Sequence, residues 1–130
     1  MGISGGGTCT LFTAALDTRI RAAFVSGYLN IFRDCILSIS HCMDNYVPGI
    51  LNWAEMYDVA GLIAPRVLFA ESGDRDRIFP ATSAVESFAK VKRVYEALDS
   101  AANADHEVFS GEHSFHGGRG LDFVAKKLGV

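Results

Sequence analysis

Residues 2–7 of the chain read Gly-Ile-Ser-Gly-Gly-Gly, and this stretch decides which fold the rest of the sequence can form. Gly2, Ser4 and Gly6 match the pattern G-x-S-x-G, which is typical of a strand that turns sharply into a helix with serine at the apex. Glycine is expected at both flanking positions because a Cβ there would collide with the neighbouring strand and helix. The Gly5 amide, at the start of the predicted helix, would point at a negative charge forming beside Ser4.

Length and composition restrict the class of protein. A chain of 130 residues predicts one domain with a real hydrophobic core. Hydrophobic residues make up 49% of the chain and charged residues 21%, as in ordinary globular proteins. The net charge is -3, and the alternation of Lys and Arg at residues 90–93 is typical of a solvated helix face, so we expect no nucleic-acid partner. No apolar run approaches the length of a membrane span, so we expect no membrane partner either.

The cysteines indicate the cellular compartment. Cys9, Cys35 and Cys42 are odd in number and show no C-x-x-C spacing. This pattern argues against a disulfide framework and favours reduced, buried thiols in a cytoplasmic protein. The first residues are rich in glycine, whereas a signal peptide begins with basic and then apolar residues. We therefore expect a cytoplasmic location.

Helical and strand-like segments alternate along the sequence. Continuous apolar runs at residues 21–27 and 65–73 predict strands buried on both faces, and a less hydrophobic strand is predicted at residues 105–110. Helices are predicted at residues 5–16, 29–39, 51–60, 81–98 and 121–128. This alternation predicts an α/β fold with a short, mostly parallel sheet of about three strands and helices on both faces. Residues 29–64 exceed what one crossover needs, so we expect a lid or pocket wall there.

Side chains suited to catalysis follow two of the predicted strands. Asp74 and Asp76 come directly after the second strand, and His113 and His116 follow the third. Because the carboxyl ends of parallel strands meet at one edge of a sheet, these side chains are expected to lie near one another. Acyl transfer by serine needs a nucleophile, a general base and an acid that orients the base. With Ser4, the sequence supplies all three in the order serine, acid, histidine.

The same segments resemble a known superfamily. Residues 2–7, 72–80 and 111–115 resemble the α/β-hydrolases, and residues 40–49 together with 63–66 look like the acetyl-xylan-esterase and dienelactone-hydrolase branch of esterases. The resemblance spans essentially the whole chain, but only the C-terminal part of that fold, starting at the serine turn. It implies a single truncated α/β-hydrolase domain over residues 1–130.

The resemblance also implies roles for individual residues. The pattern G-x-x-D-x-x-[VF]-P places the acid at Asp76 and not at Asp74, and the pattern G-x-H-x-F places the base at His113. Ser4 would be the nucleophile of a serine esterase for small or short-acyl esters. The Gly5 amide would bind the oxyanion. No cofactor is expected.

Two further residues are expected at the wall of the substrate site. We place His116 and Trp53 there as substrate-binding residues, although Trp53 is also consistent with a core position. His116 belongs to the same Gly/His loop as the predicted base, and Trp53 lies in the predicted lid segment.

Each catalytic residue has a plainer alternative. Ser4 is also consistent with a turn serine near the chain end, and Asp76 with an acid that caps the helix following Pro80. His113 is also consistent with a loop histidine bonded to backbone. Zinc binding by His41, Cys42 and the two loop histidines is another possibility, but these spacings match no strong zinc signature.

The segment before the serine turn raises an expectation about assembly. Only Met1 precedes Gly2, whereas members of the superfamily carry several strands before this turn. The strand at residues 21–27 would then form an exposed hydrophobic edge, which is a template for pairing with another chain. We expect a homo-oligomer, most simply a two-fold dimer. The alternative to an esterase is a catalytically inactive fragment that self-associates. A binding or accessory domain is a third class, for which the sequence offers no positive feature.

Overall fold

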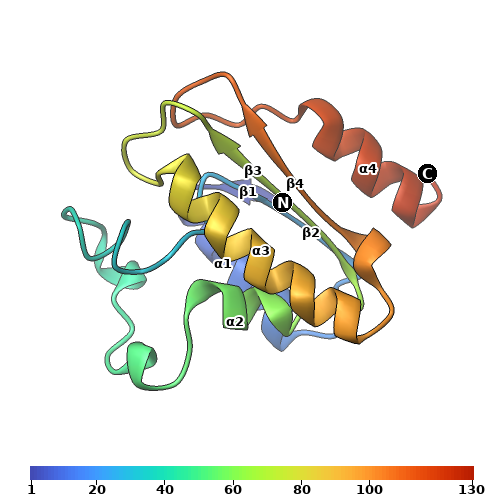
Figure 1. Ribbon diagram of the computed structural model, residues 1–130, viewed down its shortest axis with the longest axis horizontal. Helices are drawn as coiled ribbons and strands as arrows, with labels where there is room; N and C mark the ends of the chain where they lie inside the picture. Colours follow the sequence, from blue (N-terminus) through green and yellow to red (C-terminus); the bar gives the residue numbers. More distant parts are fainter.

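The computed structural model describes residues 1–130, which form a four-stranded parallel sheet between helices (Figure 1). The strands β1 (Gly2–Ile3), β2 (Ala22–Ser26), β3 (Val67–Gly73) and β4 (Ala104–Phe109) lie side by side in chain order. The helices are α1 (Gly5–Leu16), α2 (Met56–Gly61), α3 (Ala81–Ala97) and α4 (Gly118–Leu128). Short 3-10 turns are η1 (Met43–Asn45), η2 (Ile50–Asn52) and η3 (Ala101–Asn103). The predicted α/β class is confirmed, with one strand more than expected.

The two central strands are buried on both faces, which explains why their sequences show no polar alternation. Alternate residues of β2 and β3, such as Val25 and Leu68, belong to a large core cluster with α1, α2 and α3. Phe24 and Phe69 point to the opposite face and pack with Val124 of α4. In Figure 1, α4 lies alone beyond the sheet, while α1, α2 and α3 gather on the other side. All four strands run parallel, so their carboxyl ends meet at one edge of the sheet.

The strand at residues 21–27 does not expose a hydrophobic edge, so this prediction is wrong. β1 covers part of this edge, since Gly2 pairs with Val25 and Ile3 pairs with Ser26. Ala23, Phe24 and Val25 are at most 1% exposed because they point to the two faces that helices cover. The homodimer stays a prediction.

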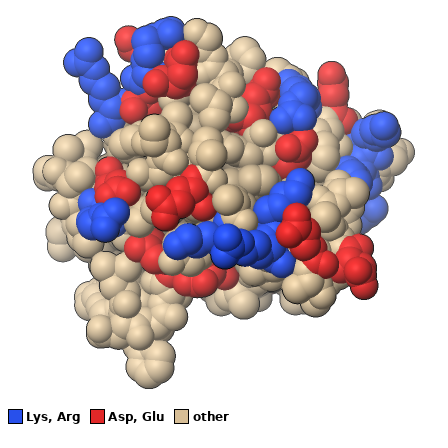
Figure 2. All heavy atoms as spheres, in the orientation of Figure 1, with Lys and Arg blue, Asp and Glu red and all other residues tan.

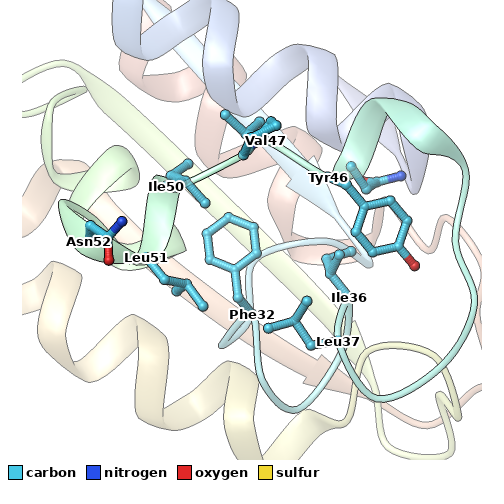
Figure 3. Close-up of a pocket in the computed structure, with 11 residues that line it drawn as sticks. Phe32, Ile36, Leu37, Tyr46, Val47, Ile50, Leu51 and Asn52 are labelled. Atoms are coloured by element: carbon cyan, nitrogen blue, oxygen red, sulfur yellow. The ribbon is translucent and has the colours of Figure 1, made fainter.

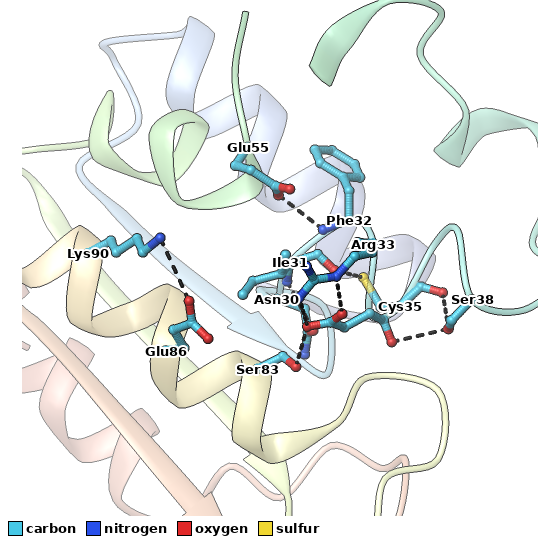
Figure 4. A network of polar contacts seen from close by, with 11 residues as sticks. Asn30, Ile31, Phe32, Arg33, Cys35, Ser38, Glu55, Ser83, Glu86 and Lys90 are labelled. Carbon is cyan, nitrogen blue, oxygen red and sulfur yellow. Dashed lines mark hydrogen bonds and ion pairs between the residues drawn. The ribbon is translucent and has the colours of Figure 1, made fainter. Parts of the chain in front are cut away.

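The helix predicted at residues 29–39 is also wrong, because the segment forms turns with mixed hydrogen bonding. The amides of Asp34 and Cys35 both donate to the Ile31 carbonyl, at 3.0 and 3.2 Å, and the Leu37 amide donates to the Phe32 carbonyl at 2.9 Å. The amide of Phe32 donates to Glu55 Oε2 at 3.0 Å, and the amide of Ile31 donates to the side chain of Asn30 at 3.0 Å (Figure 4). Short turns result, in which the predicted apolar residues Phe32, Cys35 and others are nevertheless buried.

The helix predicted at residues 51–60 is divided into two pieces, η2 and α2. Glu55 separates them because its side chain caps α2 by accepting from the amide of Met56 at 3.2 Å. Asp58 closes the capping box by accepting from the Glu55 amide at 2.8 Å. The same Glu55 carboxylate therefore caps α2 and accepts from the amide of Phe32.

Residues 37–53 form a lobe with little charge. Asp44 is the one Asp, Glu, Lys or Arg in this segment, and exposed apolar side chains include Met43 and Trp53. Figure 2 shows an uncharged projection at the lower left, where Figure 1 draws these residues, while Lys, Arg, Asp and Glu intermingle elsewhere on this face.

The cysteines differ from expectation. Cys35 is buried, but Cys9 and Cys42 are exposed. Cys9 lies on the outer side of α1 and Cys42 in the uncharged lobe, so the prediction of three buried thiols is wrong.

None of the helices has the length and the apolar character that a membrane-spanning helix needs.

Candidate active site

Ser4 stands at the apex of a strained turn between β1 and α1. Its backbone angles are φ 53 and ψ -120, a region that residues with a Cβ rarely adopt. Its amide donates to the Ser26 carbonyl at 3.1 Å, and its carbonyl accepts from the Thr8 amide at 2.9 Å. The Ser4 side chain makes no capping hydrogen bond to the helix. A serine retained only as a helix cap would use its hydroxyl in that way, so the hydroxyl is available for another partner.

Close packing explains the glycines around this turn, but only in part as predicted. A Cβ on Gly2 would lie 2.9 Å from the Gly6 Cα and still closer to the Gly6 carbonyl. A Cβ on Gly6 would meet open space, so the predicted steric role of Gly6 is wrong. Gly7 has that role instead, since its Cβ would lie 2.7 Å from the Tyr28 Cβ. The turn is held by contact of α1 with the residues that follow β2.

The N-terminus of α1 supplies amides near Ser4. The first helical hydrogen bond is the one that Thr8 donates to Ser4, so the amides of Gly5 and Gly6 precede it. Gly5 is exposed, and a Cβ added to it would meet no other atom within 4 Å, so the space around this residue is open. Amides at a helix N-terminus favour negative charge. The predicted oxyanion residue therefore lies at a position with the right chemistry.

Asp76 and His113 form a hydrogen-bonded pair. Asp76 Oδ2 lies 2.7 Å from His113 Nδ1, and the Asp76 side chain is only 1% exposed. The other carboxylate oxygen accepts from the amides of Ile78 at 2.8 Å and Phe79 at 2.9 Å. Asp76 thus fixes the local turn and orients the histidine at the same time. It does not cap α3, whose N-cap is Pro80 and which has no side-chain cap, so the capping alternative is wrong.

Hydrogen bonding decides the charge of Asp76. Burial works to raise the pKa of this carboxyl, but the hydrogen bonds from His113, Phe79 and Ile78 outweigh it and hold the pKa below its usual value. Asp76 is therefore ionised at neutral pH. An ionised carboxylate on Nδ1 fixes the tautomer of a histidine and stabilises its protonated form.

The remaining ring nitrogen of His113 is unpaired. Its Nε2 atom is buried and has no hydrogen-bond partner, and no hydrogen bond joins it to the Ser4 hydroxyl. The ring stacks on Phe79, with centroids 5.6 Å apart. Catalytic hydrogen bonds are often long before substrate binds and tighten in the substrate complex.

One short segment places Ser4 and His113 at the same end of β2. The Ser4 amide bonds to Ser26, and the next residue, Gly27, lies against the His113 ring. A Cβ on Gly27 would be 3.1 Å from His113 Cε1, and Gly27 also has a positive φ of 51. Glycine is required there for both reasons.

Glu71 is a site residue that the sequence did not reveal. It is 1% exposed, and its Oε1 atom accepts from the Ser26 hydroxyl at 2.7 Å and the His116 amide at 2.8 Å. Its Oε2 accepts from the Gly117 amide at 3.0 Å. Glu71 therefore ties the histidine loop to the sheet. The signal was a single acidic residue within the buried run of β3.

The other predicted residues lie apart from this pair. Asp74 is exposed and accepts from the Gly111 amide at 2.9 Å, so it joins two loops and does not contact His113. His116 stacks on Phe109 with centroids 4.7 Å apart, and it is not part of the Asp76–His113 pair. Trp53 is 89% exposed because it ends η2 on the outside of the lobe, so the structure does not place it at a pocket wall.

No group of three or more His, Cys, Asp or Glu side chains is arranged to hold a metal ion. His41 lies near Phe79, at 5.7 Å between ring centroids, while Cys42 is exposed.

Comparison with known proteins gives the fold. Neither a protein-family model nor a curated protein sequence matches the chain. Among solved structures, a CE15 glucuronoyl esterase from Caldicellulosiruptor kristjansonii matches with a TM-score of 0.79 and 18% identity over 99% of this chain. The glucuronoyl esterase catalytic domain from Hypocrea jecorina matches with a TM-score of 0.75 and 18% identity over the full chain. A putative dienelactone hydrolase from Klebsiella pneumoniae matches with a TM-score of 0.55 and 17% identity over 98% of it.

The chain spans 42%, 44% and 48% of the lengths of these three structures. The likeness therefore shows that this chain has an α/β-hydrolase fold and corresponds to less than half of those proteins.

Proposed function

We propose that this chain with its α/β-hydrolase fold is a serine carboxylic-ester hydrolase that acts on small or short-acyl esters through an acyl-enzyme. The observation that carries the proposal is the 2.7 Å hydrogen bond between Asp76 and His113, whose Nε2 atom is buried and unpaired. Ser4 supports it with the strained φ of 53 that exposed nucleophiles adopt at such turns. The structural neighbours support it because they are glucuronoyl esterases, a methylesterase and a putative dienelactone hydrolase.

In this mechanism the Ser4 Oγ attacks the ester carbonyl while His113 Nε2 accepts the hydroxyl proton. Ionised Asp76 stabilises the resulting imidazolium through Nδ1. The Gly5 amide donates a hydrogen bond to the oxyanion. Amides held in place in this way stabilise the negative charge that develops in the transition state. His113 then protonates the leaving alcohol, and water hydrolyses the acyl-enzyme by the same steps.

Hydrolysis of p-nitrophenyl acetate tests the proposal, with two serine variants compared. Ser4→Ala is expected to lower kcat by at least about 10³-fold, as loss of the nucleophile does in serine hydrolases. Ser72→Ala is the matched control, because Ser72 also contacts a histidine but is 3% exposed within β3. It should retain activity. Far-ultraviolet circular dichroism checks that both variants fold.

Two results would contradict the proposal. Equal activity of Ser4→Ala and wild type would rule out Ser4 as the nucleophile. A folded wild-type chain with no hydrolysis above the buffer rate would favour the alternative, a catalytically inactive fragment that self-associates.

A further inference from the structure

The uncharged lobe borders a pocket that the catalytic proposal does not use. Its volume is about 280 Å³, and none of its eleven lining residues is charged. Figure 3 shows the Phe32 ring at the centre, with Ile50 and Leu51 on one side and Ile36, Leu37 and Tyr46 on the other. An apolar pocket of this kind is the common form of a small-molecule site, although this one is at the small end of the usual range.

Two of the three polar side chains that line the pocket, those of Asn45 and Tyr46, are already engaged. Asn45 Oδ1 accepts from the Thr8 hydroxyl at 3.2 Å, and its amide nitrogen donates to the Cys42 carbonyl at 3.4 Å. The Tyr46 hydroxyl accepts from the His41 amide at 3.0 Å. A charged or sugar-like group would lose its water here and find few partners in return. The lining therefore suits an uncharged hydrocarbon group.

Two chains of contacts join the pocket to the proposed catalytic residues. On one side, Asn45 bonds to Thr8, whose amide bonds in turn to the Ser4 carbonyl. This places the pocket wall one helical turn from Ser4.

On the other side, Tyr46 holds the backbone of His41, whose ring lies 5.7 Å from Phe79. Phe79 stacks in turn on His113, with centroids 5.6 Å apart. His41 Nε2 is buried without a hydrogen-bond partner, as is His113 Nε2. Buried polar atoms without partners are rare, and a functional role is one of the explanations for them. The chain of contacts from Tyr46 to His113 therefore includes an unpaired ring nitrogen at His41.

We propose that this pocket binds an uncharged apolar group of the ester substrate, of the size of a phenyl ring or a short alkyl chain. The inference rests on the proposed esterase function and names the substrate class for it. A cavity of about 150 Å³ is known to hold benzene, so the volume here suffices for a phenyl group with space for a linking bond. Two series of substrates distinguish whether this group belongs to the acyl or to the alcohol part of the ester.

Two substrate series test the proposal. One lengthens the acyl chain from p-nitrophenyl acetate to butyrate, and the other enlarges the alcohol from methyl to benzyl acetate. Each buried methylene is expected to raise kcat/KM by about fourfold in the series whose group enters the pocket. The other series should be flat. If neither series responds to apolar size, the proposal is wrong.

A variant that fills the pocket with a larger side chain provides a second test, with a matched control. Leu51 is 50% exposed and lines the pocket, so Leu51→Trp adds an indole there without disturbing the core. Leu62 is 62% exposed beyond the end of α2 and does not line the pocket, so Leu62→Trp is the control. Leu51→Trp should abolish the preference for larger groups, whereas Leu62→Trp should retain it. Identical behaviour of the two variants would overturn the proposal.

A binding measurement keeps this inference separate from the catalytic one. Benzyl alcohol is titrated into the Ser4→Ala variant and followed by nuclear magnetic resonance, where shifts of Phe32 and Ile50 report on the pocket. Saturable shifts that Leu51→Trp removes would support the pocket even if the chain hydrolyses no ester. Absence of saturable shifts would refute it, even if Ser4 proves to be the nucleophile.

Discussion

Two histidines of this protein have similar neighbours and different chemistry. His106 lies within β4 and packs against Phe88, with ring centroids 5.3 Å apart, while His113 lies after β4 and packs against Phe79 at 5.6 Å. Only His106 is hydrogen-bonded to a serine, since its Nε2 lies 3.1 Å from Ser72 Oγ. The Ser–His contact most easily recognised in the structure is thus the one far from the predicted serine turn.

The difference lies in what else each histidine contacts. Burial lowers the pKa of His106 to about 4, and Asp105 opposes this shift only in part. His106 is therefore neutral at physiological pH and is part of the structure between β3 and β4. His113 has the ionised Asp76 on Nδ1 and an unpaired Nε2. A serine beside a histidine is not sufficient for catalysis, because the base also needs a carboxylate that stabilises its protonated form.

The largest expected effect separates the two histidines by activity. His113→Gln should lower kcat for p-nitrophenyl acetate by at least about 10²-fold, because it removes the general base. His106→Gln retains a group that can bond to Ser72 and should leave kcat nearly unchanged. Steady-state kinetics at about pH 7.5, where His106 of the wild type is neutral, provides the measurement. A comparable loss in both variants would mean that the histidines are not functionally distinct.

A smaller effect concerns stability against pH. The pKa of His106 is about 4 in the folded protein, and the unfolded chain has a value of about 6.5. Between these values the unfolded chain binds more protons, so the free energy of unfolding should fall as the pH drops through this window, by about 3 kcal/mol in all. Urea unfolding across the window measures this loss, and His106→Gln should lose less than wild type.

Asp76 acts in a lower window and provides an internal check. Its pKa is lower in the folded protein than its usual value, so its contribution is complete above about pH 3.9 and is lost only below that point. An equal loss of stability in wild type and His106→Gln above that pH would show that His106 does not titrate as stated.

The smallest effect concerns the strain at Ser4. Ser4→Gly should be more stable than Ser4→Ala by about 1 kcal/mol, because glycine adopts the positive φ without a Cβ penalty. Thr10, inside α1, provides the control, since Thr10→Gly should be less stable there than Thr10→Ala. Urea unfolding of the four variants gives the two differences. Differences of the same sign at both positions would show that the Ser4 backbone is unstrained.

The sequence by itself predicted the parts of the fold that depend on local pattern. Alternating apolar segments predicted the strands at residues 21–27, 65–73 and 105–110 and the helix at 81–98, all close to the observed bounds. The loops after these strands indicated Asp76 and His113, because parallel strands bring their carboxyl ends together. The resemblance to the α/β-hydrolases implied Asp76 and not Asp74, and the structure pairs Asp76 with the histidine.

Only the tertiary structure decided features that depend on residues distant in the chain. Glu55 accepts from the amide of Phe32 across 23 positions, a contact that no local pattern indicates. Glu71 accepts from three donors, one in β2 and two in the loop before α4, and no local pattern indicates these partners. Trp53 is exposed because the lobe packs through Phe32 and its neighbours, and Gly7 contacts Tyr28 because α1 lies on β2. Local sequence sets the elements and the order of reactive residues, whereas long-range hydrogen bonds and packing choose which of them meet.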